Sequence, residues 1–331
     1  MKILIVSGFL GAGKTTFIKE LIRRSGVRPV IMENEYGDNT IDARELERQL
    51  PRAGEMKILE FMEGCVCCSM KDSFVNSVLT VFSGLEPEYL VIEPTGVGRL
   101  SNILANLQPI LHENISLLQP VAVIAPRAFA MNMSQWPELY ADQIKHAQII
   151  IFSKCENEDP AVIEETAAQV RRLNPAAQII SEHYRTKPED WWRSLMDLPA
   201  LQTDALPEES AGGRTPEQIG IRQGRLSRPA ELIMLLEDCL RGELGLIARA
   251  KGTLPVGGEM LRFDLADGLY AVTGSEESLS QCVVIGRNLL REEICRRFGS
   301  SLTAESFELD KKIASPPVWE GKLPRRPFIP Q

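Results

Sequence analysis

Residues 8–16, GFLGAGKTT, constrain the fold of this chain more than any other stretch. They fit the pattern GxxxxGK[ST] of a phosphate-binding loop and have the neighbours that such a loop requires. The apolar run at 3–6 is typical of a buried parallel strand, and the apolar positions within 17–22 are spaced as one face of a helix that Ser25-Gly26 can end. A strand, a glycine-rich turn and a helix N-terminus together point backbone N–H groups at one place, where they can bind a nucleoside triphosphate.

The side chains of this loop have expected roles. Lys14 reaches the β- and γ-phosphates, and the Thr15 hydroxyl is a ligand for Mg²⁺. The alternative is a glycine-rich turn with a chance lysine, and the strand and helix on either side argue against it. The residues expected to bind the nucleotide phosphates are Gly8, Gly11, Ala12, Gly13, Lys14, Thr15 and Thr16.

Further apolar runs predict an α/β domain with a mostly parallel sheet flanked by helices. One of these runs ends in EPTG at 93–96. An acid at such a strand end can hold Mg²⁺ or the attacking water, and a glycine amide close behind can sense the γ-phosphate, so we assign these roles to Glu93 and Gly96. The polar loop at 33–38 is expected near the phosphates, although a solvated acidic turn explains it equally well. The predicted strands are 3–6, 30–32, 57–62, 89–92, 121–125, 149–152 and, at the edge, 178–180; helices are predicted at 74–82 and 161–173.

The strand predicted at 149–152 runs into Ser153-Lys154-Cys155-Glu156. This is close to NKxD, the loop in which a carboxylate accepts from guanine N1–H and the 2-amino group while the lysine stem packs over the ring. Serine here replaces asparagine and glutamate replaces aspartate. We therefore expect Ser153, Lys154 and Glu156 to bind the base and to prefer GTP over ATP less strictly than NKxD does. Taken alone, an ordinary strand end with charges is the alternative.

The chain is expected to form two domains, because 331 residues are too many for one hydrophobic core. A polar stretch at 203–216, rich in Pro, Gly, Glu and Ser, is the predicted linker between a phosphate-loop domain at 1–202 and a smaller domain at 217–315. Mixed strands with two helices suggest that the smaller domain is an α+β layer of ferredoxin-like type. A Pro-rich tail at 316–331 is expected to be irregular.

Charge and cysteine usage exclude several classes of partner. The net charge of −8 and the lack of a long basic run argue against nucleic acid, and no apolar stretch has the length of a membrane span. Three of the seven cysteines crowd into 65–68 and the other four are scattered, which is not a disulfide framework. We therefore expect a cytoplasmic protein with one thiol cluster of special purpose. The sequence is compatible with a homodimer and does not decide the oligomeric state.

Taken together, these motifs resemble the CobW family, GTPases of metal homeostasis in the larger group that includes the urease and hydrogenase nickel-insertion GTPases. The resemblance covers nearly the whole chain, and CxCC between the phosphate-binding loop and the acidic strand end is quite specific. It implies a GTPase domain followed by a smaller C-terminal domain, in a metallochaperone or metal-cofactor assembly factor; the family name also suggests cobalamin. The matching segments are GFLGAGKTT at 8–16, NEYGDNTID at 34–42, GCVCC at 64–68, EPTG at 93–96, QIKHAQIIIFSK at 143–154, LNPAAQI at 173–179 and RAKG at 249–252.

The chain departs from the family pattern at three places. Asparagine is expected where Ser153 stands, and the aspartate usual after the middle strand is missing at Ala125-Pro126. The His-rich stretch of many members is also absent, since the chain has only three histidines: His112, His146 and His183.

The thiol cluster is a candidate metal site. Cys65, Cys67 and Cys68 offer three sulfurs, and thiolates prefer Zn²⁺, Cu(I), Co²⁺ or Ni²⁺ to Mg²⁺. By the family pattern, Glu35 is the nearest acidic ligand to complete the site; two sulfurs with Glu35 and a water would serve equally. An incomplete protein shell would suit a carrier. Buried structural thiols and a redox-sensing pair are the alternatives.

These expectations combine into one mechanism. The γ-phosphate, through Mg²⁺ and the Gly96 amide, orders the acidic loop and the CxCC segment and thereby fixes the metal ligands. Hydrolysis then releases these loops, and the C-terminal domain reads the switch and contacts the client protein. No arginine finger can be assigned from the sequence, so intrinsic turnover should be slow, on the order of 10⁻⁴ to 10⁻² per second. The alternatives are a metal-free nucleotide switch with CxCC as a redox sensor and, less favoured, a small-molecule kinase.

Overall fold

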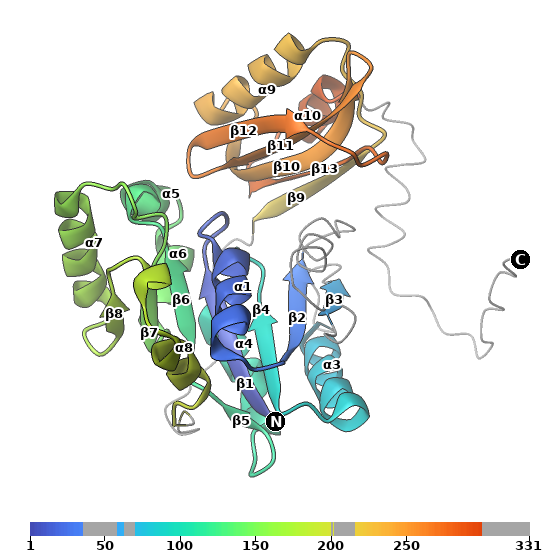
Figure 1. Cartoon of the computed structure of the whole chain (residues 1–331). Helices are drawn as coiled ribbons and strands as arrows, with labels where there is room; N and C mark the ends of the chain where they lie inside the picture. The colour runs from blue at the N-terminus through green and yellow to red at the C-terminus, as the bar shows by residue number, and fades with distance from the viewer. Residues whose placement is uncertain (36–57, 63–69, 200, 202–215, 300–331) are drawn as a thin grey trace, which may run out of the picture.

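The computed structural model describes residues 1–35, 58–62, 70–199, 201 and 216–299. The thiol cluster at 65–68, nearly all of the predicted linker and the Pro-rich tail lie outside the described residues. Within them the chain forms two sheets, one built by the N-terminal part of the chain and one by the C-terminal part (Figure 1).

All strand pairings of the first sheet are parallel, as predicted. Its order is β3-β2-β4-β1-β6-β7-β8, and β5 also pairs with β1. The order reverses direction at β1, which places the phosphate-binding loop at the point where ligands bind in open α/β sheets. The strands are β1 (Lys2–Gly8), β2 (Val30–Glu35), β3 (Ile58–Met62), β4 (Tyr89–Glu93), β5 (Ser116–Leu117), β6 (Val121–Ile124), β7 (Ile149–Phe152) and β8 (Gln178–Ile180).

Helices cover both faces of this sheet, which explains why its strands are apolar throughout. In β1, Ile3 and Ile5 pack into one hydrophobic core, while Leu4 and Val6 pack into the core on the opposite face. The helices α1 (Lys14–Ser25) and α8 (Glu189–Met196) cover the second of these faces. The first is covered by α3 (Met70–Leu85), α4 (Leu100–Leu107), α5 (Phe129–Gln135), α6 (Pro137–Lys145) and α7 (Pro160–Leu173).

The structure confirms the predicted strands and the helices α1, α3 and α7. The end of α1 is also as expected, because Gly26 is its C-cap with φ 74°. The helices α4, α5, α6 and α8 were not predicted from the sequence. Each of these helices has only seven to nine residues, and a segment of that length gives a weak helical periodicity.

The second sheet is antiparallel, with the order β12-β11-β10-β13-β9. Tight turns at Gly257-Gly258 and Asp267-Gly268, where all four residues have positive φ, join three of its strands as hairpins. The predicted α+β layer is present, but its connections differ from the β-α-β-β-α-β order of a ferredoxin-like layer, since the second helix follows the last strand. The elements are β9 (Glu217–Arg222), α9 (Pro229–Arg241), β10 (Leu246–Val256), β11 (Glu259–Ala266), β12 (Leu269–Gly274), β13 (Gln281–Arg287) and α10 (Arg291–Arg297).

The two sheets share a hydrophobic contact. One face of the second sheet packs on α9 and α10, which lie at the top of Figure 1. On its other face, Ala248, Val283 and Ile285 join the core of the first sheet, and the Arg287 guanidinium lies 4.1 Å from the centre of the Trp136 ring. Among the described residues, no helix is both long enough and apolar enough to cross a bilayer.

Candidate functional site

A cavity of about 820 Å³ lies between the two sheets. Its lower wall consists of the phosphate-binding loop and the C-terminal ends of β2 and β4, and the 154–158 segment after β7 lines it as well. Residues of β10, β11, β12 and β13 form the opposite wall. A volume of this size is typical of a small-molecule or cofactor site.

The phosphate-binding loop has the backbone that its sequence predicts. Gly13 is the N-cap of α1 with φ 92°, a left-handed conformation that strongly favours glycine. The helix begins at Lys14, so its first N–H groups point out of the loop toward the cavity. Lys14 is buried, and its Nζ donates to the Phe9 carbonyl at 3.3 Å.

Two carboxylates lie at the neighbouring strand ends. The Thr15 hydroxyl donates to Glu93 Oε1 at 2.9 Å, which brings together the two residues expected to hold Mg²⁺. Glu33 on β2 is the register partner of Glu93 on β4, is only 3% exposed and also lines the cavity. A hydroxyl and two carboxylates beside a phosphate-binding loop form an oxygen donor set that fits Mg²⁺. From the sequence, Glu33 was predicted only to belong to the polar loop at 33–38.

Gly96 lies directly against the phosphate-binding loop. A Cβ at this position would be 2.5 Å from the Leu10 backbone nitrogen, so any larger residue would push the two loops apart. Gln143 of α6 fixes the loop from the other side, because its Nε2 donates to the carbonyls of Gly96 at 3.1 Å and Gly98 at 2.9 Å. The backbone of the predicted γ-phosphate sensor is therefore held by contacts that do not involve a nucleotide.

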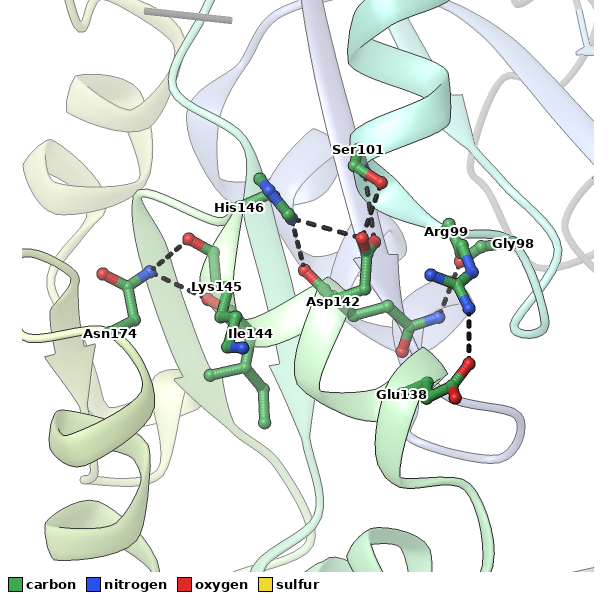
Figure 2. Close-up of polar contacts among 10 residues, drawn as sticks. Gly98, Arg99, Ser101, Glu138, Asp142, Ile144, Lys145, His146 and Asn174 are labelled. Atoms are coloured by element: carbon green, nitrogen blue, oxygen red, sulfur yellow. Dashed lines mark hydrogen bonds and ion pairs between the residues drawn. The ribbon is translucent and has the colours of Figure 1, made fainter. Parts of the chain in front are cut away.

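The same helix holds the start of α4 (Figure 2). The buried Asp142 carboxylate accepts from the Ser101 backbone N–H at 3.1 Å and from the Ser101 hydroxyl at 2.5 Å, which caps α4. His146 lies beside it, with Nδ1 3.4 Å from Asp142 Oδ1. The hydrogen bond to Asp142 raises the pKa of His146. Burial acts to raise the pKa of Asp142, but hydrogen bonds from His146 and Ser101 outweigh it, and the pKa is lowered.

A second polar anchor ties α7 to the end of α6. Asn174 is buried, and its Nδ2 donates to the carbonyls of Ile144 at 2.8 Å and Lys145 at 3.0 Å (Figure 2). The figure also shows the exposed pair of Arg99 and Glu138, whose Nη2 and Oε2 are 3.0 Å apart. None of these residues lines the cavity; Asn174 connects α7 to α6, and the Arg99–Glu138 pair connects the start of α4 to α6.

The predicted base-binding residues follow β7, but they have different surroundings. Ser153 is 2% exposed and donates from Oγ to the Ala12 carbonyl at 2.6 Å, so it ties the strand end to the phosphate-binding loop. Lys154 and Glu156 line the cavity. Lys154 Nζ lies 2.8 Å from Asp267 Oδ2, and Glu156 Oε1 lies 2.8 Å from His183 Nε2.

Most of the predicted transition-metal site lies outside the described residues. Cys65, Cys67 and Cys68 lie outside the described residues, and so does the side chain of Glu35. The described backbone nevertheless pairs Glu35 at the end of β2 with Met62 at the end of β3, three residues before the first cysteine of the cluster. Within the described part of the chain, no three His, Cys, Asp or Glu side chains cluster as metal ligands would.

Several cavity residues had no assigned role in the sequence. They are Glu33, Lys19, Arg127, Arg249, Lys251, Arg262, Asp264 and Asp267. The acidic strand end was a usable signal for Glu33. Arg249 and Lys251 belong to the family-matching segment RAKG at 249–252, but that match assigned them no role. The residues from β11 and the turn after it carried no signal, because alternating charges on a strand have the same pattern whether they face water or another domain.

Comparison with known proteins agrees with the geometry of the loop. The sequence profile of the CobW/HypB/UreG nucleotide-binding domain matches residues 2–181. The chain is 28% identical to the zinc chaperone YeiR of Escherichia coli over 211 residues, which cover 62% of this chain and 61% of YeiR. It is 26% identical to the zinc chaperone YjiA of Escherichia coli over 326 residues, or 89% of this chain and 97% of YjiA.

Among solved structures, the Zn(II)-bound YjiA GTPase from E. coli aligns with 90% of this chain and 98% of its own, at 21% sequence identity and a TM-score of 0.43. The profile match covers more than half of the chain and includes the phosphate-binding loop, the EPTG strand end and the segment after β7. The chain belongs to the CobW-like family of P-loop GTPases.

Proposed function

We propose that this chain is a GTP-hydrolysing metallochaperone or metal-cofactor assembly factor. The observation that carries the proposal is that one and the same cavity is lined by Lys14, by the Thr15–Glu93 pair, and by Lys154 and Glu156 of the predicted base-binding segment. Residues for the phosphates and for a base thus surround one space.

In this proposal the protein groups divide the work on the nucleotide. Lys14 exchanges the Phe9 carbonyl for the β- and γ-phosphates, and the Gly96 N–H contacts the γ-phosphate. Thr15 and Glu93 hold Mg²⁺, with Glu33 beside them; when bound, the ion neutralises charge on the phosphates. Glu156 accepts from guanine and Lys154 covers the ring. Intrinsic turnover is slow, on the order of 10⁻⁴ to 10⁻² per second.

The transferred metal binds at Cys65, Cys67 and Cys68, with Glu35 or a water completing the site. Zinc is the first candidate, because relatives of this chain are named zinc chaperones, and Co²⁺ or Ni²⁺ also suit thiolate ligands. Support for coupling comes from the backbone: β2 pairs with β3 just before the cysteine segment and with β4 at Glu93. The γ-phosphate can therefore order the metal ligands through neighbouring strand ends, and hydrolysis releases the metal to a client protein.

The test measures both sites together. Reduced protein is titrated with Zn²⁺ and Co²⁺ in the presence of a non-hydrolysable GTP analogue or of GDP. Metal affinity is expected to differ between the two nucleotide states by about 5- to 150-fold, and linkage requires the same factor in the effect of metal on nucleotide binding. Cys65→Ala, Cys67→Ala and Cys68→Ala should lose the metal and keep GTP binding.

Cys239→Ala is a matched control, since this thiol is buried in the C-terminal core and its pKa is raised to about 12 by burial. Metal binding at full stoichiometry in the cluster variants would contradict the assigned ligands, and a reduced wild type that binds no metal would favour the metal-free switch with CxCC as a redox sensor. Identical metal affinity with both nucleotides would remove the coupled mechanism. Phosphate transfer to an acceptor in place of free phosphate release would identify a kinase.

A further inference from the structure

Three cationic side chains of the second sheet face the phosphate-binding loop. Arg249 and Lys251 of β10 and Arg262 of β11 line the cavity from its upper wall. Residues that alternate with them, such as Ala250 and Phe263, pack into the core under α9 and α10. The period-2 pattern of the strands thus separates an apolar face, which is covered by helices, from a charged face turned to the nucleotide site.

The register of the sheet places Arg249 nearest to the loop. A Cβ added at Gly11 would lie 2.7 Å from the Cβ of Ala266, so the end of β11 touches the phosphate-binding loop. Ala266 is the register partner of Arg249 across the antiparallel pair. Directly opposite residues of such a pair have Cα atoms about 4.5 to 5.5 Å apart, well within the reach of an arginine side chain.

The neighbours of Arg249 hold it in a defined position. Its Nε and Nη2 donate to the two carboxylate oxygens of Asp264 at 3.3 and 3.0 Å, and the side chain is only 17% exposed. Lys251, two residues further along the same face, is 7% exposed. Lysine and arginine are rarely this buried unless they are paired, and the pair with Asp264 accounts for the burial of Arg249. Their place on the cavity wall, across from the phosphate-binding loop, is what suits both side chains to a polyanion.

We propose that Arg249 and Lys251 form an in-cis phosphate-binding wall that contacts the terminal phosphate of the nucleotide bound at the loop. The inference rests on the proposed function, because it takes a nucleoside triphosphate as the ligand. Lys14 binds the phosphates from below, and Arg249 and Lys251 bind them from above. The wall exists only while the second sheet is seated on the first, so the terminal phosphate helps to hold the C-terminal part of the chain in this position.

The test compares Arg249→Ala and Lys251→Gln with the wild type in the full-length protein. Each variant is expected to bind a non-hydrolysable GTP analogue about 10- to 150-fold more weakly, while GDP binding changes by no more than about twofold. Single-turnover hydrolysis at saturating GTP should fall with Arg249→Ala, since an arginine on the transferring phosphoryl group contributes about 10³- to 10⁵-fold.

Two control variants separate this role from a structural one. Asp264→Asn breaks the same ion pair but removes a negative charge, so the analogue should bind as in the wild type or more tightly. Arg241→Ala removes an exposed arginine of α9 that lies outside the cavity, so this variant should bind the GTP analogue and GDP as the wild type does. Equal weakening in Arg249→Ala and Asp264→Asn, or unchanged analogue binding in Arg249→Ala, would overturn the wall. If instead Arg249→Ala and Lys251→Gln show the expected loss of analogue binding but the wild type never releases phosphate from GTP, the proposed function fails and the wall stands.

Discussion

At the residue scale, the hydrogen bonds of the Ser153 side chain go to the backbone of the phosphate-binding loop and of β6. Its hydroxyl has one proton to donate, and that proton goes to a carbonyl of the phosphate-binding loop in a buried setting. The second acceptor within reach, the Ile124 carbonyl at 3.3 Å, also belongs to the backbone. We infer that the side chain positions the loop and, in the proposed complex, leaves selection of the base to Lys154 and Glu156.

This division predicts opposite behaviour for two substitutions. Ser153→Ala leaves the Ala12 carbonyl without this partner, which should lower the free energy of unfolding by about 1 to 3 kcal/mol. The variant should also bind GDP and ADP more weakly, both by the same factor. Glu156→Ala should keep stability and abolish the preference for GDP over ADP, a preference that a charge-assisted bond makes about 10- to 150-fold. Calorimetric titration of both nucleotides measures this. A changed GDP to ADP ratio in Ser153→Ala would mean that the hydroxyl does contact the base.

At the scale of the elements, α6 connects the supports of the nucleotide site. Neighbouring residues on this helix cap α4 through Asp142 and hold the Gly96 loop through Gln143. His146, one turn after Asp142, adds a contact that depends on pH. The polar residues of α6 thus keep the predicted γ-phosphate sensor in place while the apolar ones pack under the sheet.

A pH dependence of stability follows from this arrangement. The pKa of His146 in the folded protein is raised above its ordinary value of 6.5. The contribution of the protonated His146 to the free energy of unfolding is therefore fully present below pH 6.5 and is lost as the pH rises through the folded pKa. His146→Gln should therefore lower the unfolding free energy by about 1 kcal/mol at about pH 5 and leave it nearly unchanged at about pH 9. Urea unfolding at both pH values measures the difference. An equal loss at both would show that protonation of His146 plays no part.

At the scale of the whole molecule, the two sheets behave as one structure because they share a core. Ile285 and Val283 of β13 pack against residues of the first sheet and its helices, while Val284 between them packs under α9. The ion pair of Lys154 and Asp267 adds little, since the lysine is half exposed. Apolar contact, with the Arg287 guanidinium over the Trp136 ring, therefore holds the two sheets together.

This predicts a single cooperative unfolding transition that GDP shifts as a whole, by about 2.7 kcal/mol at a concentration 100 times its dissociation constant. Ile285→Ala should cost about 2 to 5 kcal/mol and separate the transition into two, of which GDP shifts one. Val284→Ala is the matched control: it lowers stability but leaves one transition. Differential scanning calorimetry distinguishes the cases. Two transitions in the wild type would mean that the sheets unfold independently.

The sequence by itself determined the features that depend on local pattern. The phosphate-binding loop, the buried parallel strands and the glycine that ends α1 are specified by short-range sterics and by the spacing of apolar residues, and the structure has them at the expected positions. The strand-end acid Glu93 belongs to this group, and the structure brings it to Thr15 as the motifs suggest. The thiol cluster remains a prediction, because Cys65, Cys67 and Cys68 lie outside the described residues.

Only the tertiary structure decided what surrounds the nucleotide site. That Glu33 lies beside Glu93 depends on the pairing of β2 with β4, which no local pattern encodes. That Arg249 and Lys251 face the phosphate-binding loop depends on which face of the second sheet packs on helices and which packs on the first sheet. The physical reason is that a charged strand face has the same alternation whether it borders water or a ligand, so its role is fixed only when the two sheets come together.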